Sequence, residues 1–171
     1  MPKSVIVRRK TKETDIKIGL HVYGRGRYEI KTGISFLDHM LGLFAKHGVF
    51  DLKSVAAGDL DVDRHHTNED VGITLGEAFS RGLEKRQGIK RFGEATVPMD
   101  EALVRAVVDV SGRPFLKFNT NKIKAKDIGA YSFNHAEQFL RAFVTKAGMT
   151  VHIDVLDGQD LHHILEATFK G

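Results

Sequence analysis

The chain reads ETDIKIGLHVYGR from Glu13 to Arg25 and EALVRAVVDVSGR from Glu101 to Arg113. In both stretches an acidic residue precedes an arginine at the same spacing, and apolar side chains alternate with other residues ahead of a Gly-Arg pair. Alternation with a period of two is typical of a strand that buries one face. Its recurrence indicates a duplicated unit, which determines how the rest of the chain is interpreted.

Two further motifs recur in the same order. Phe36-Leu-Asp-His39 is followed later by Phe133-Asn-His135, and an H-H-x-x-E motif occurs at His65–Glu69 and again at His162–Glu166. The first motif recurs after 96 residues and the second after 97, a difference that a single insertion explains. We therefore expect each half to present the same set of histidines.

The predicted half-repeats cover residues 1–88 and 89–171 and together form one functional unit. Gly and Pro punctuate the boundary between Gly88 and Pro98. Alternation predicts strands, and apolar spacings of three and four residues predict two helices in each half, of which the second carries the H-H-x-x-E motif. The expected strands are Asp15–Tyr23, Val49–Ala56, Val104–Val110 and Thr150–Val155, and the apolar spacing of the first helices covers Phe36–His47 and Phe139–Ala147. Each half is then a sheet backed by helices, an α+β architecture.

Composition limits the chemistry and the partners. No cysteine occurs among the 171 residues, so thiol catalysis and disulfides are excluded, and any metal must be held by nitrogen and oxygen. Lys and Arg number 26 against 22 Asp and Glu, an excess that suits an anionic ligand without choosing between a small molecule and nucleic acid. No signal-peptide pattern and no run of about 18 apolar residues occurs, which predicts a soluble, cytoplasmic protein without a membrane partner.

Six of the nine histidines recur between the halves: His39, His65, His66, His135, His162 and His163. Residues four apart on a helix share a face, whereas adjacent residues diverge by about 100°, so His65 and Glu69 can bind one ion while His66 serves another. We predict one site with the ligands His65, Glu69, His162 and Glu166, and a second site with His39, His66, His135 and His163. These donors suit manganese, iron, nickel or zinc, and two carboxylates at one site favour a harder ion.

Several motifs occur together in one order: Phe36-Leu-Asp-His-Met-Leu41, Gly58-Asp-Leu-Asp-Val-Asp63, His65-His-Thr-Asn-Glu-Asp70, Pro98-Met-Asp-Glu101, Asp109-Val-Ser-Gly-Arg-Pro114 and His162-His-x-x-Glu-Ala-x-Phe-Lys170. In this combination the chain resembles the imidazoleglycerol-phosphate dehydratase family from Arg9 to Lys170. The resemblance implies dehydration of imidazole glycerol phosphate to imidazole acetol phosphate in histidine biosynthesis. It also implies two manganese ions per active site, two sheets flanking a helical layer, and a homo-oligomeric cage of about two dozen subunits with active sites at subunit contacts.

Position by position, the resemblance implies that Glu13 and the segment from His39 to His47 contact the substrate. Arg91 and Arg113 match the phosphate-contacting arginines of the family, and a guanidinium can donate two hydrogen bonds to phosphate oxygens. Glu13 is the expected acid–base group and His47 the second candidate, because a catalyst must have a pKa suited to proton exchange. The sequence ends before the Ser/Thr-Lys segment with which family members help to bind phosphate.

Two other functions stay open at this stage. A dinuclear metallohydrolase would use the same ligands on another phosphorylated compound and would release phosphate rather than water. A nucleic-acid-binding domain would explain the basic charge, but the run Arg8-Arg9-Lys10 lacks the interleaved aromatic residues of a stacking platform. We therefore expect a phosphorylated imidazole as the partner rather than nucleic acid.

Overall fold

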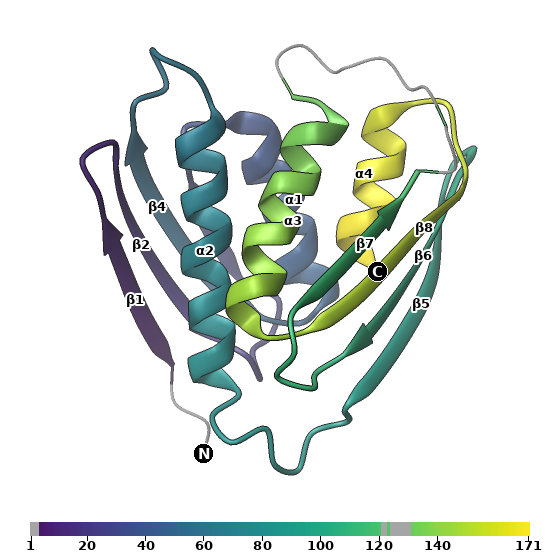
Figure 1. The fold of residues 1–171 in the computed structure, drawn as a ribbon, viewed down its shortest axis with the longest axis horizontal. Coiled ribbons are helices and arrows are strands. Elements are labelled where there is room, and N and C mark those ends of the chain that lie inside the picture. Colours follow the sequence, from purple (N-terminus) through teal and green to yellow (C-terminus); the bar gives the residue numbers. More distant parts are fainter. Residues whose placement is uncertain (1–3, 121–122, 124–130) are drawn as a thin grey trace.

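Two four-stranded sheets enclose four helices in the computed structural model, which describes residues 4–120, 123 and 131–171 (Figure 1). The first sheet has the order β1 (Val5–Lys10), β2 (Thr14–His21), β4 (Asp51–Gly58) and β3 (Tyr28–Lys31), and the second has β5 (Phe92–Met99), β6 (Ala102–Asp109), β8 (Thr150–Asp157) and β7 (Phe115–Asn119). In each sheet the first three strands are antiparallel, and the last strand is parallel to its neighbour. The predicted α+β fold with a repeated plan is confirmed.

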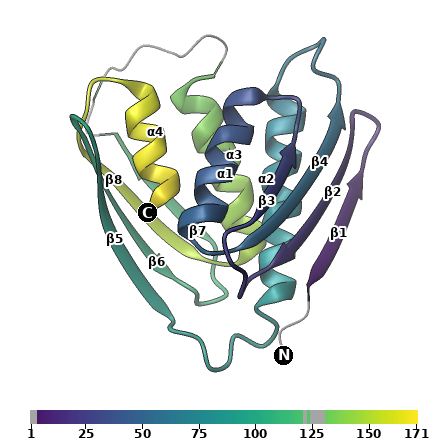
Figure 2. The same ribbon diagram turned by 180° about the vertical axis from the view of Figure 1, so that it is seen from behind.

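The helices are α1 (Ser35–His47), α2 (His65–Gly82), α3 (Phe133–Ala147) and α4 (Leu161–Lys170). They lie between the two sheets, as both views show (Figures 1 and 2). Helix α2 packs on α3 and α1 packs on α4, so each pair joins a helix of the first half to a helix of the second. None of the helices described is long and apolar enough to cross a membrane. The predicted division at residue 88 falls in the segment between α2 and β5 and stays a prediction.

The four predicted strands correspond to β2, β4, β6 and β8, the central strands of the two sheets. The four strands that alternation did not predict, β1, β3, β5 and β7, all lie at sheet edges. A central strand buries one whole face against the helices, as β2 does with Ile16, Ile18 and Leu20. The edge strand β3 differs, because none of its residues is fully buried and Tyr28, Glu29 and Lys31 are all exposed.

Glycines allow α2 and α3 to approach closely. A Cβ atom at Gly72 would lie 2.7 Å from the carbonyl oxygen of Phe139, and a Cβ at Gly76 would meet the carbonyl oxygen of Phe143. Because a backbone carbonyl cannot move aside as a side chain can, only glycine fits at this distance. The small residues of α2 therefore fix how near α3 stands to the first histidine motif.

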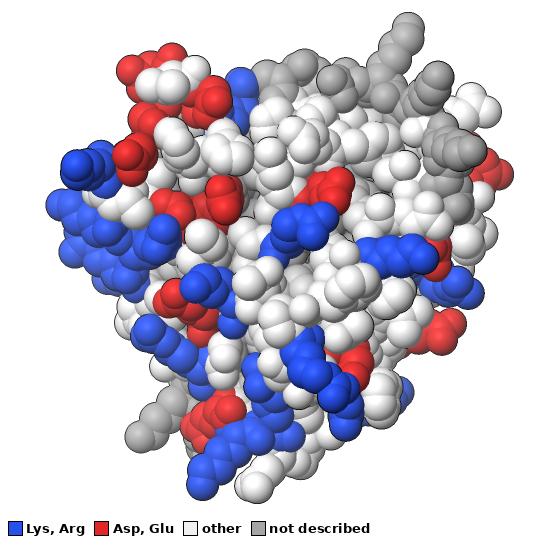
Figure 3. Space-filling view, viewed as in Figure 1, with Lys and Arg blue, Asp and Glu red and all other residues white. Residues whose placement is uncertain are grey.

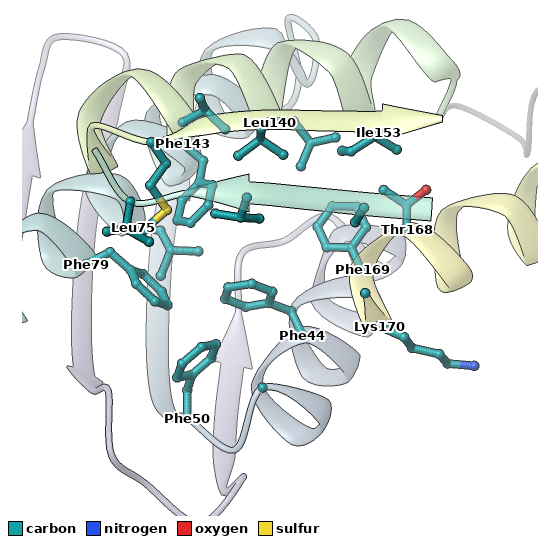
Figure 4. Close-up of a pocket in the computed structure, with 18 of the residues that line it drawn as sticks. Phe44, Phe50, Leu75, Phe79, Leu140, Phe143, Ile153, Thr168, Phe169 and Lys170 are labelled. Carbon is teal, nitrogen blue, oxygen red and sulfur yellow. The ribbon is translucent and has the colours of Figure 1, made fainter. Parts of the chain in front are cut away.

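The core also contains an apolar cavity of about 340 Å³ (Figure 4). Aromatic rings line it, with Phe44 of α1 meeting Phe143 of α3 edge to face at 5.9 Å. Lys170 borders the cavity, but its side chain points away from it. None of the motif histidines among the described residues lines this cavity, so it is a feature of the core and not the candidate active site.

Candidate active site

One group of three side chains with the donor atoms of a metal site stands out among the described residues, and it consists of His39, His162 and Glu166. Their donor atoms all lie within 4.8 Å of one another. His39 Nε2 is 2.9 Å, and His162 Nε2 is 3.0 Å, from the same carboxylate oxygen, Oε1 of Glu166. Two imidazole nitrogens and one carboxylate oxygen thus converge from α1 and α4, a donor set suited to a divalent metal ion.

Local sequence explains the α4 side of this cluster. Asp160 caps the helix by accepting a hydrogen bond from the backbone N–H of His162 at 2.7 Å, so the helix begins at the motif. His162 and Glu166 are four residues apart and therefore share a face. Phe36 of α1 packs edge to face on the His162 ring at 5.3 Å, which holds α1 and its His39 against α4.

Glu166 is a buried carboxylate with three cationic or hydrogen-bonding neighbours. Burial opposes its ionisation, but hydrogen bonds from Lys170, His39 and His162 outweigh burial and lower the pKa of Glu166 to about 2. The Lys170 Nζ atom lies 2.6 Å from Glu166 Oε2, the oxygen that faces away from the two histidines. Glu166 is therefore ionised at neutral pH and has one oxygen directed at the imidazoles.

A second cluster has a similar arrangement, but here the H-H-x-x-E motif lies on α2 of the first half and the contacting residue lies on α3 of the second half. His65 and Glu69 lie on α2, where His65 Nε2 is 3.4 Å from Glu69 Oε2. At the start of α2 the side chain of Asp63, two residues before the helix, accepts a hydrogen bond from the backbone N–H of His65 at 2.7 Å. The residue that reaches this motif from α3 is Gln138, whose Oε1 lies 3.0 Å from His65 Nδ1.

His66 and His163, which follow the first histidine of each motif, have different partners. His66 Nδ1 is 2.8 Å from Asp59, and His163 Nδ1 is 2.6 Å from Glu101. These carboxylates raise the pKa of both histidines. Backbone N–H groups of residues 160 and 159, together with His163, lower the pKa of Glu101 to about 2.

His135 contacts the α2 motif through its backbone, because its carbonyl oxygen accepts a hydrogen bond from Asn68 Nδ2 at 2.8 Å. Its ring Nδ1 accepts a hydrogen bond from the backbone N–H of Ser132 at 3.2 Å and closes a capping box at the start of α3. The ring also stacks on Tyr131, with 5.2 Å between centroids. The structure thus groups the ligands differently from the prediction, since His39 joins His162 and Glu166 rather than His135.

Arg91 and Arg113 lie together at one end of the second sheet. Arg91 donates two hydrogen bonds to Asp109, at 2.6 and 3.1 Å, and Arg113 Nη2 is 4.0 Å from the same carboxylate. Both guanidinium side chains are more than half exposed. Their carboxylate partner competes for the guanidinium groups, and Arg91 lowers the pKa of Asp109. The two arginines form a cationic pair that an anion can reach.

The two predicted acid–base residues are both exposed. Glu13 lies in the turn between β1 and β2, and its charge contributes to the raised pKa of His66. His47 ends α1, about 12 Å along the helix axis from His39. Glu13 therefore interacts electrostatically with a histidine of the α2 motif.

The sequence matches the profile of the imidazoleglycerol-phosphate dehydratase family over residues 32–171. The chain belongs to this family. The imidazoleglycerol-phosphate dehydratase of Thermoanaerobacter pseudethanolicus is 57% identical over 164 residues, which cover 96% of this chain and 84% of the relative. That of Pelobacter propionicus is 51% identical over 170 residues, covering 99% and 87%.

Solved structures agree with this membership of the imidazoleglycerol-phosphate dehydratase family. The Staphylococcus aureus enzyme superimposes with a TM-score of 0.84 at 36% identity, covering 98% of this chain and 92% of that chain. The Pyrococcus furiosus enzyme, solved in complex with (S)-C348, gives a TM-score of 0.83 at 40% identity, covering 96% and 88%. The chain is therefore a lyase that carries out a dehydration in histidine biosynthesis, and the substrate of its family is a phosphorylated imidazole.

Sequence reasoning missed two residues that the structure brings to this dehydratase site. Lys170 stands four residues after Glu166, a helical spacing that points to the ion pair. Gln138 had no such signal, because an amide is not a conspicuous metal ligand and the motif comparison selected His135 instead.

Proposed function

We propose that the chain is a metal-dependent dehydratase that converts imidazole glycerol phosphate to imidazole acetol phosphate in the cytoplasm. The observation that supports metal dependence is the convergence of His39 and His162 on one oxygen of an ionised Glu166. We further propose two manganese ions, one at this cluster and one at the cluster that contains His65 and Glu69. Nitrogen and oxygen donors without thiolate suit such an ion, and a carboxylate at each cluster favours manganese among the candidates.

The bound metal ion would supply Lewis-acid stabilisation of the substrate's imidazole ring in its anionic form. The residues of the chain hold the ion's ligands in place and bind the rest of the substrate. Lys170 fixes Glu166 by pairing with the oxygen that His39 and His162 do not contact. Glu13 is the proposed acid–base group, because its exposed carboxylate lies in the electrostatic environment of His66, with His47 as the second candidate.

The phosphate group is proposed to bind Arg91 and Arg113. Each guanidinium is exposed enough to turn from Asp109 to a phosphate, which offers more charge and more acceptor oxygens than a carboxylate. Acidic side chains gather instead over the loop before α2, which contains Asp59, Asp61 and Asp63 (Figure 3). The charge distribution therefore favours phosphate binding at the arginine end.

The arginine pair and the first cluster lie at opposite ends of β6. Glu101, which contacts His163, directly precedes the strand, and Asp109 is its last residue. Eight residues of strand span about 24 Å, far more than the length of the substrate. We infer that the arginines of one subunit serve the histidines of a neighbour, which makes the active site a subunit contact. A homo-oligomeric cage of about two dozen subunits would provide such contacts.

A nucleic-acid partner has less support. Basic side chains gather over β1 and β2 at the left of Figure 3, but Arg8 pairs with Asp15 and Lys53 of β4 pairs with Glu29. These ion pairs neutralise part of the charge that would attract a phosphate backbone. A metallohydrolase would share the metal ligands, so it must be distinguished by its products.

The decisive test is a product assay on the chelated and the manganese-restored protein. Imidazole acetol phosphate should form from imidazole glycerol phosphate only after manganese is restored, and inorganic phosphate should not appear. His162→Asn should abolish the reaction, whereas His152→Asn, a change at an exposed histidine on β8, should not. Full activity after complete metal removal would refute metal dependence, and phosphate release would favour the hydrolase.

A further inference from the structure

The burial pattern of α1 and α3 determines which of their residues are equivalent. Shifting α1 by 99 residues places four of its five buried positions on buried positions of α3: Leu37 on Ala136, Met40 on Phe139, Leu41 on Leu140 and Ala45 on Val144. The fifth, Gly42, falls on the exposed Arg141. The shift of 96 that the histidine motifs suggested places only one of the five, Met40, on a buried residue, Ala136. In the packing register, His39 corresponds to Gln138 and not to His135.

A direct contact supports the same equivalence. His39 extends from α1 to the motif on α4, and Gln138 extends from α3 to His65 of the motif on α2, at 3.0 Å. His135 instead closes the capping box with Ser132 at the start of its own helix. Helix register and side-chain contact, two independent observations, therefore place Gln138 beside the second H-H-x-x-E motif.

We propose that the second metal site uses the amide oxygen of Gln138 where the first uses the imidazole of His39, so that the two sites are unequal. The proposal rests on the proposed metal dependence. An amide oxygen is a neutral, hard donor that suits Mn²⁺ better than Zn²⁺, for which imidazole is the stronger ligand. The second site is therefore the weaker of the two and the more selective for hard ions.

Preorganisation strengthens this inequality. In the first cluster both Nε2 atoms point at one oxygen of Glu166, whose side chain is 11% exposed. In the second cluster, Gln138 and Glu69 lie at opposite nitrogens of the His65 ring, and the Glu69 side chain is 46% exposed. Side chains must reorient and lose solvent before all three donors can meet one ion, which lowers affinity further.

Manganese titration of the chelated full-length protein tests the proposal, with free Mn²⁺ measured by its electron paramagnetic resonance signal. The wild type should show two classes of Mn²⁺-binding site, one tight and the other at least about tenfold weaker in affinity. Changes beyond the direct ligands already alter metal affinity by that factor. Gln138→His should bring the second class close to the first and raise its affinity for Zn²⁺. Gln138→Glu, a change of the same shape, should also tighten Mn²⁺ binding.

Two further variants complete the design. His39→Gln should convert the tight class into a weak one, because it gives the first site the donor set of the second. His135→Gln should leave both classes unchanged, and circular dichroism confirms that each variant is folded. The proposal would be overturned if the two classes of site in the wild type had equal Mn²⁺ affinity. It would also be overturned if His135→Gln weakened Mn²⁺ binding at the second class while neither Gln138 variant changed it. Absence of any Mn²⁺ binding would instead refute the metal dependence on which it rests.

Discussion

Replacing Gly72 with alanine tests the close packing of α2 on α3. The added Cβ would lie 2.7 Å from the carbonyl oxygen of Phe139 and 3.1 Å from Cβ of Ala142, whereas ordinary contacts begin at 3.4 Å. The two helices must therefore separate by several tenths of an ångström. Both obstacles belong to backbone or to a short side chain, so no rotamer change can remove them.

The magnitude follows from two opposing terms. Overpacking a tight contact costs about 1 to 3 kcal/mol, while alanine in place of glycine favours the helix by about 1 kcal/mol. We expect a net loss of up to about 2 kcal/mol, which corresponds to a fall in Tm of up to about 8 °C for a chain of this size. Gly76→Ala should cost more, because its Cβ would approach Phe143 and Lys146 of α3 more closely still.

Thermal unfolding followed by circular dichroism, at one protein concentration and without metal, measures the effect. Gly42→Ala in α1 is the matched control, since the atoms nearest to its Cβ all belong to the ring of Tyr28, at 2.9 Å and beyond, and that half-exposed side chain can move. The control keeps the gain in helix propensity without a backbone clash, so it should be as stable as the wild type or more stable by up to about 1 kcal/mol. A Gly72→Ala protein as stable as the control would refute the argument that backbone contact sets the spacing of α2 and α3.

Three further predictions concern the site. Arg91→Ala should raise KM at least about tenfold, which corresponds to the loss of about 1.4 kcal/mol or more of charged hydrogen bonding to the substrate phosphate. Its metal content should not change. Steady-state kinetics and elemental analysis check these two expectations, and an unaltered KM would contradict the assignment of Arg91 to phosphate binding. Chelation should dissociate a large oligomer and abolish activity together, because an ion bound at an active site that lies at a subunit contact, as proposed above, adds to the association energy. Light scattering that shows constant mass after complete metal removal would exclude this coupling. Glu101→Gln should lower the pKa of His163, which Glu101 raises. In the metal-free protein this pair stabilises the fold below the ordinary histidine pKa, and the contribution disappears as pH rises through the raised value, so an NMR titration with no shift would contradict the ion pair.

The sequence alone determined the central strands and which motif residues share a helix face. A strand that buries one face must place apolar residues at every second position, so β2, β4, β6 and β8 could be predicted, whereas the edge strands could not. Helical spacing likewise required His65 and Glu69, and their counterparts on α4, to share a face.

Tertiary structure decided which residues of different helices meet. His39 joins His162 because α1 packs on α4 from the other half, and no local spacing encodes that choice. The letters of the two motifs align His39 with His135, but the burial phase of α1 and α3 aligns it with Gln138. A helix turns its ligands toward a partner according to which of its faces is buried, and that face is fixed by packing against the rest of the molecule rather than by the identity of any one residue.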